Sequence, residues 1–148
     1  MDENKDFSAK YVLSAEYQPL WERAKAVLQT IDAPADEHTL AQAIVAETKD
    51  GRLFSSGVAD WFASPKDEAE LCPEERTLIE ELRAADSPVV RLLCCMWEVE
   101  DRPPLPLDMS SYAFRKALCA LHKENGNARL PLIGKPGYIT KTVFETLP

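Results

Sequence analysis

Apolar residues along most of this chain recur at the three- and four-residue spacing that is typical of amphipathic helices. Pro19 suits the first position of a helix, and Leu20, Ala24, Leu28 and Ile31 then share one face. Similar patterns, bounded by residues that cap or stop helices, predict further helices over residues 36–50, 55–64, 73–84, 88–99 and 110–124. The chain is therefore predicted to be mainly α, a small multi-helix domain of five or six helices.

The segment from Val89 to Val99 is apolar on nearly every side. Only Arg91 and Glu98 interrupt it. A helix that is hydrophobic all round is normally buried at the centre of its domain. We therefore interpret this segment as the central helix.

The last part of the chain changes character. Residues 129–133, a turn at 134–137 and residues 138–144 predict a C-terminal β-hairpin, because the second arm alternates and is rich in β-branched side chains. The alternative interpretation makes Thr140–Leu147 a short helix. Before this region, the proline-rich residues 102–107 predict an extended connector.

At 148 residues, the chain has the length of one domain. The charged residues 66–70 indicate a weak seam near residues 64–72, between an N-terminal helical part and a C-terminal helix-plus-hairpin part. No apolar run approaches the ~20 residues of a membrane span, and the first residues are too polar for a signal peptide. We therefore expect a cytoplasmic protein without membrane contact, whose oligomeric state the sequence leaves open.

Motifs that carry chemistry are scarce. The sequence contains no glycine-rich phosphate loop, no G-x-S-x-G and no H-E-x-x-H segment. Cys119 and His122 have a spacing that zinc ligands can have, but they lie in a predicted helix and not in paired knuckles. We expect the four cysteines to be reduced and mostly buried. The sequence thus predicts a protein that is not an enzyme and has no metal and no cofactor.

Charge is distributed unevenly along the chain. The formal net charge is −8, yet residues 112–148 carry six basic and two acidic residues. A basic helix over 110–124 followed by a hairpin resembles a winged helix, in which the helix enters the major groove and the wing contacts phosphates. The leading interpretation is therefore a small non-enzymatic cytosolic regulator that binds nucleic acid, or a nucleic-acid-associated complex. The residues expected to make these contacts are Arg115, Lys116, Lys123, Lys135 and Lys141.

An acidic run over residues 67–81 supports an alternative function. Seven acidic residues in this short stretch could mimic a phosphate backbone and dock on a basic protein, since complementary charge speeds association. The alternative is thus an acidic inhibitor or immunity-type protein, a nucleic-acid mimic that blocks a basic target. Its expected contact residues are Glu74, Glu75, Glu80 and Glu81. In either case we expect a protein partner.

Overall fold

The computed structural model describes residues 13–30, 40–58, 71–98, 105–106, 111–133 and 138–147. The three α-helices in this part of the chain are α2 (Gln18–Thr30), α3 (Pro73–Ala85) and α4 (Tyr112–Leu121). The six strands are β1 (Leu40–Thr48), β2 (Leu53–Val58), β3 (Val89–Glu98), β4 (Leu105–Pro106), β5 (Arg129–Ile133) and β6 (Tyr138–Thr142). Three short 3-10 helices are η1 (Ala15–Tyr17), η2 (Lys123–Asn127) and η3 (Phe144–Thr146).

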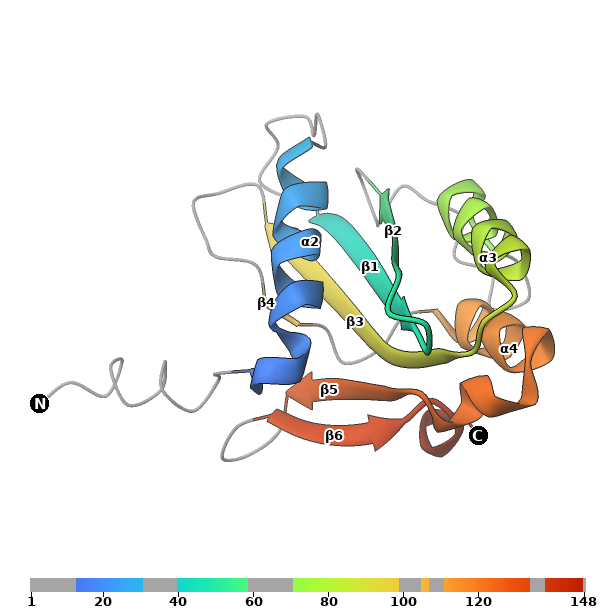
Figure 1. Ribbon diagram of the computed structural model, residues 1–148. Helices are drawn as coiled ribbons and strands as arrows, with labels where there is room; N and C mark the ends of the chain where they lie inside the picture. The colour runs from blue at the N-terminus through green and yellow to red at the C-terminus, as the bar shows by residue number, and fades with distance from the viewer. Residues whose placement is uncertain are drawn as a thin grey trace, which may run out of the picture.

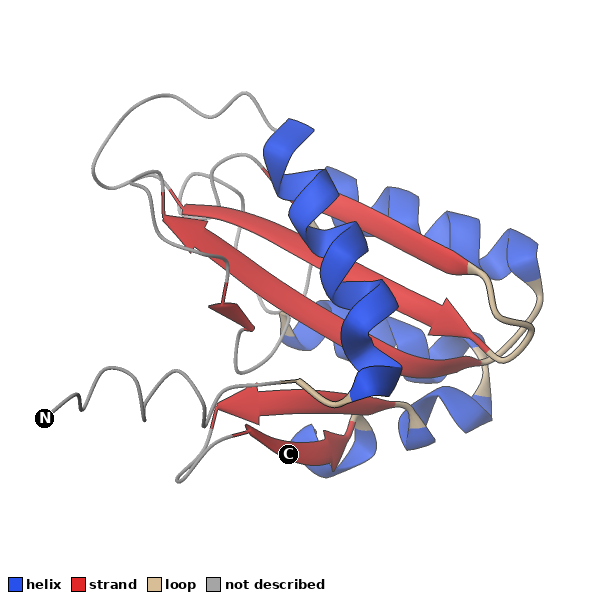
Figure 2. Cartoon of the chain, turned by 60° about the vertical axis from the view of Figure 1, so that its left-hand side comes forward, coloured by secondary structure: helices blue, strands red, loops and turns tan. Residues whose placement is uncertain are grey.

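The strands form one mixed sheet in the order β2-β1-β3-β5-β6, and β4 pairs with β3 beside this path. Neighbouring strands are antiparallel except β3 and β5, which are parallel. Helix α2 covers one face of the sheet, whereas α3 and α4 cover the other face (Figures 1 and 2). The described part of the chain is thus a three-layer α/β/α arrangement.

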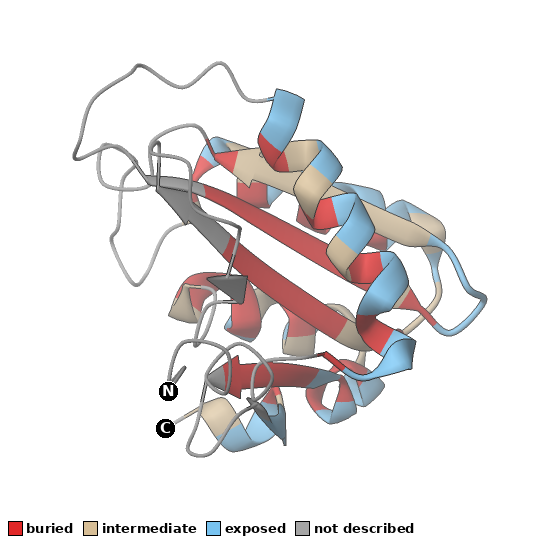
Figure 3. Ribbon diagram, turned by 90° about the vertical axis from the view of Figure 1, so that its left-hand side faces the viewer, coloured by how far each residue is buried: buried red, intermediate tan, exposed pale blue. Residues whose placement is uncertain are grey.

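Most described side chains of the central strands β1 and β3 are buried (Figure 3). Ile44 and Leu92 point into the core beneath α3 and α4, while Val45 and Leu93 point into the core beneath α2. Successive side chains of a strand point to opposite faces. Strands placed between two helical layers therefore carry nearly continuous apolar sequence.

The expectation of a mainly α protein is wrong. Of the predicted helices, those over 36–50 and 88–99 contain the strands β1 and β3, and the one over 55–64 overlaps the end of the strand β2. Periodicity alone does not separate a buried helix from a strand that is buried on both faces. The supposed central helix is therefore the central strand β3.

Other local predictions are confirmed. Helices α2, α3 and α4 lie close to the predicted ranges, and β5 and β6 pair as the predicted hairpin. The winged-helix interpretation is wrong, because β5 also pairs in parallel with β3 and so belongs to the main sheet. The extended connector is observed at Leu105–Pro106, which pair with β3, and its other residues lie outside the described ranges.

The remaining expectations concern the seam, the cysteines and the membrane. Most of residues 64–72 lie outside the described ranges. All four cysteines are free thiols, and Cys72, Cys94 and Cys95 are buried, as expected. Among the described residues, no helix is both long enough and apolar enough to span a membrane.

Candidate functional site

The start of α3 carries a buried carboxylate. Pro73 occupies the first turn and Cys72 is the N-cap residue. The backbone N–H of Cys72 donates to Oε1 of Glu75 at 3.1 Å, which satisfies one of the donors that a helix start leaves open. Glu75 is only 4% exposed. The first turn of α3 thus holds its own acidic side chain inside the protein.

The start of α4 meets this carboxylate. Ser111 is the N-cap residue of α4, and its Oγ accepts from the backbone N–H of Phe114 at 3.1 Å. The same hydroxyl donates to Oε2 of Glu75 at 2.7 Å. The two oxygens of Glu75 therefore connect the starts of both helices. We refer to Cys72, Glu74, Glu75 and Ser111 as the helix-start cluster.

Strands β1 and β2 lie beneath the helix-start cluster. The hydroxyl of Ser56 donates to the backbone oxygen of Glu74 at 2.9 Å. Ser56 pairs with Ile44, and the next pair on the same face is Val58 with Gln42, about 7 Å further along the strands. Gln42, which is 2% exposed, therefore faces the same layer as the start of α3.

Two buried polar atoms at this place have no hydrogen-bond partner within the described part of the chain. They are Nε2 of Gln42, a donor, and Oε2 of Glu74, an acceptor. Leaving such an atom unpaired costs about 1–3 kcal/mol, so native proteins rarely do so without a reason. The start of α3 and the strand β1 thus carry one unpaired acceptor and one unpaired donor in the described part of the chain.

The thiol of Cys72 has a pKa above the ordinary value of a cysteine. Burial is the main cause, and it raises the pKa of Cys72 to about 12. A protonated thiol is a poor nucleophile and a poor metal ligand. At this site Cys72 therefore contributes its backbone N–H to Glu75 and does not contribute a thiolate.

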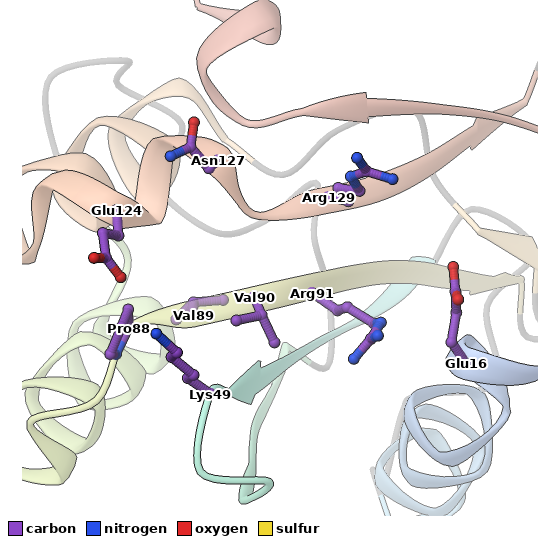
Figure 4. A pocket seen from close by; sticks show the side chains of 9 residues that line it. All are labelled: Glu16, Lys49, Pro88, Val89, Val90, Arg91, Glu124, Asn127 and Arg129. Atoms are coloured by element: carbon purple, nitrogen blue, oxygen red, sulfur yellow. The ribbon is translucent and has the colours of Figure 1, made fainter.

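A pocket lies near the start of β3, away from the helix-start cluster. This pocket, of about 430 Å³, is lined by Glu16, Lys49, Glu124, Arg129 and by residues 88–91 and 127 (Figure 4). The carboxylate of Glu47 forms an ion pair with Arg91. Since acidic and basic side chains both line the pocket, its charge selects neither anions nor cations.

The basic residues that were predicted to contact nucleic acid differ in their exposure to solvent. Arg115 is 6% exposed and donates to the backbone oxygen and to Oγ1 of Thr146, at 2.7 and 2.9 Å. It therefore anchors the C-terminal segment and is not a surface contact. Lys116, Lys123 and Lys141 are exposed, and Lys135 lies outside the described residues.

The acidic residues predicted to bind a protein also differ in their exposure and contacts. Glu75 is buried in the helix-start cluster, and Glu80 forms an ion pair with Arg83. Glu81 is exposed and Glu74 is partly buried. Gln42 and Ser111 were not among the residues predicted to be functional. The spacing Cys72-Pro73-Glu74 was the one local signal that pointed to this place.

Comparison with solved structures identifies the fold. Cytidine deaminase from Bacillus anthracis matches with a TM-score of 0.61 at 19% identity, over 88% of this chain and 85% of that chain. The enzyme from Burkholderia pseudomallei matches at 0.54 and 18% identity, over 92% and 98%. The enzyme from Mycobacterium leprae matches at 0.51 and 17% identity, over 86% and 97%. The chain therefore has the cytidine deaminase fold.

Comparison at the level of sequence adds nothing to this assignment. No family model matches the sequence, and no curated protein matches it. The structural likeness nevertheless corrects the functional expectations. The expectation of a non-enzymatic regulator is wrong, because the solved structures that share the fold are those of enzymes. The alternative of an acidic inhibitor is not supported either.

The residues present do not fit the zinc ion of the zinc deaminases. Those enzymes hold zinc through a histidine or cysteine in an H-x-E type segment and through the two cysteines of P-C-x-x-C. Cys72-Pro73-Glu74 has the first spacing, but the sequence contains no Pro-Cys pair and no two cysteines three positions apart. Among the described residues, no group of three histidine, cysteine or acidic side chains could hold a metal. We therefore assign no zinc ion to this site.

Proposed function

We propose that this chain acts on a pyrimidine nucleoside of the cytidine class, which it holds by the edge of the base between Gln42 and Glu74. The chemistry within reach of its own residues is proton transfer at the carboxylate of Glu74. Glu75 and Ser111 position the helix starts and do not contact the base.

The polar edge of cytosine matches the two unpaired atoms. Its exocyclic amino group is a donor, for which a glutamate is a suitable acceptor. Its ring nitrogen and carbonyl oxygen are acceptors, which an amide N–H such as Nε2 of Gln42 can satisfy. Binding would therefore remove the cost of two buried polar atoms, Nε2 of Gln42 and Oε2 of Glu74.

Glu74 has the better position for proton transfer. Both oxygens of Glu75 already accept hydrogen bonds, from Cys72 and from Ser111. Oε2 of Glu74 is buried without a partner in the described part of the chain. Glu74 also stands two residues after Cys72, the position at which zinc deaminases carry the glutamate that acts as a general acid and base.

The observation that carries the proposal is this complementary pair of unpaired atoms in a chain with the cytidine deaminase fold. Calorimetric titration of the full chain with cytidine and with uridine tests it. Cytidine is expected to bind saturably and more tightly than uridine, because the oxygen at position 4 of uracil is an acceptor that would face the acceptor Glu74.

Two variants test the site and one variant serves as the control. Q42A and E74Q are each expected to weaken cytidine binding by about tenfold or more, which corresponds to the loss of at least 1.4 kcal/mol. E81Q changes an exposed glutamate on the same helix and should bind cytidine as the parent does. Failure of the parent to bind any pyrimidine nucleoside, or unchanged binding in Q42A and E74Q, would contradict the proposal.

A further inference from the structure

We infer that the helix-start cluster binds no zinc ion. The hydrogen bonds of Glu75 with Ser111 and Cys72 join the starts of α3 and α4 in place of a metal ion. This inference does not depend on the identity of the ligand. It rests on the donor atoms that the two helix starts supply and on the contacts that these atoms already make.

The start of α4 lacks zinc ligands. Its first residues are Ser111, Tyr112, Ala113 and Phe114, so the two positions with C-x-x-C spacing from the N-cap carry a hydroxyl and a phenyl ring. Zinc in proteins is bound by thiolate, imidazole and carboxylate groups. Phe114 has no donor atom, is 0% exposed and packs in the core beneath α3 and α4.

The start of α3 also lacks a complete set of zinc ligands. Both oxygens of Glu75 already accept hydrogen bonds, at 3.1 Å from Cys72 and at 2.7 Å from Ser111. A zinc ion bound to this carboxylate would have to displace at least one of them. The displaced Ser111 hydroxyl would lose a charge-assisted hydrogen bond in a partly buried place.

Cys72 supplies the one sulfur atom of the helix-start cluster. Zinc binds the thiolate, so its binding must remove the proton. Burial raises the pKa of Cys72 to about 12 when no metal ion is bound, so a zinc ion would have to displace this proton. The cluster has one thiol and two carboxylates, those of Glu74 and Glu75, but among the described residues no three such groups lie close enough together to hold a metal ion, whereas protein zinc sites have three or four ligands.

Cys119 and His122 do not complete the set. Nδ1 of His122 accepts from the backbone N–H of Glu124 at 3.1 Å, so this nitrogen already caps η2. Cys119 packs against the hydrophobic core. These two residues lie at the end of α4, whereas the cluster lies at its start.

Metal analysis of the intact chain tests the inference. The chain, produced without a polyhistidine tag, is incubated with zinc sulfate and desalted, and its zinc content is measured by plasma mass spectrometry. The expected content is far below one ion per chain. About one zinc ion per chain that is lost in both C72S and E75Q would overturn the inference. Zinc retained equally by these variants would lie elsewhere, and the inference would stand.

Thermal unfolding gives a second readout. A chelator is expected to leave the midpoint of the parent unchanged, whereas S111A lowers it by several degrees because it removes both the cap and the bridge. S87A is the matched control, since the Ser87 side chain forms no hydrogen bond with the described residues, and its midpoint should stay close to that of the parent. A chelator-induced loss in the parent as large as that of S111A would overturn the inference.

Discussion

Ser111 Oγ lies 2.7 Å from Oε2 of Glu75, although the two residues are 36 positions apart in the sequence. This hydrogen bond connects the N-cap of α4 to the first turn of α3. The same hydroxyl caps α4 by accepting from Phe114, and the other oxygen of Glu75 accepts from Cys72. One serine and one glutamate therefore fix how the two helix starts lie against each other.

A double-mutant cycle is expected to show that Ser111 and Glu75 act together. S111A and E75Q should each lower the free energy of unfolding by about 1–3 kcal/mol, because each leaves a buried polar group without its partner. The double variant should cost less than the sum of the two, with a coupling of about 0.5–3 kcal/mol. Urea unfolding of the four proteins measures it, and strictly additive effects would show that the contact does not contribute.

Exchange of Glu74 for glutamine is expected to change which base is preferred. In E74Q the new amide can present its N–H₂ as a donor to the oxygen at position 4 of uracil, while its loss of charge weakens the contact with the amino group of cytosine. The ratio of uridine to cytidine dissociation constants should therefore fall by about tenfold or more relative to the parent. An unchanged ratio would place the base elsewhere.

Arg115 is expected to behave as a structural residue. R115A removes the hydrogen bonds that hold Thr146, and the free energy of unfolding should fall by about 1–3 kcal/mol. K116A, the change at the exposed neighbour, should stay within about 0.5 kcal/mol of the parent. Chemical denaturation compares the two variants. An R115A protein as stable as K116A would mean that the contacts with Thr146 contribute nothing.

The turn between β1 and β2 is expected to lose stability in acid. The hydrogen bond from Arg52, with a smaller effect of Thr48, lowers the pKa of Asp50 from 3.8 to about 2. A lowered carboxyl pKa stabilises the fold above the unfolded value, and this contribution disappears as the pH falls through the folded value. The difference in melting temperature between the parent and D50N should therefore shrink between about pH 4 and pH 2.

Arg52 also connects this turn to the end of α3. Its guanidinium also donates to the backbone oxygen of Ala85, at 2.8 Å, near the end of α3. E81Q, whose altered side chain is exposed, is a suitable control for the acid titration. A difference between the parent and D50N that stays constant down to pH 2 would show that the Asp50 carboxylate does not favour folding.

The helices were predictable because each has one apolar face and clear end signals. In α2, the buried residues Leu20, Ala24 and Leu28 follow the expected helical spacing, and α3 starts at the expected Pro73. The central strands were not predictable from periodicity. Ile44 and Val45 are neighbours in sequence and both are buried, because each contacts a different helical layer.

The candidate site depends on topology that local sequence does not reveal. Cys72 and Pro73 mark a helix start in the sequence, but nothing near Ser111 shows that its partner is Glu75. That contact exists because β3 lies between α3 and α4 in the chain and returns the start of α4 to the start of α3. Gln42 was not recognised for a different reason, because its strand was interpreted as a helix.

A crystal structure of the full chain grown with cytidine tests the central claim most directly. We expect base density with the exocyclic amino group at Oε2 of Glu74 and a ring acceptor at Nε2 of Gln42. The hydrogen bond of Ser111 to Glu75 should be intact. Cytidine bound in the pocket lined by Lys49 and Arg129, with Gln42 and Glu74 still unpaired, would contradict it.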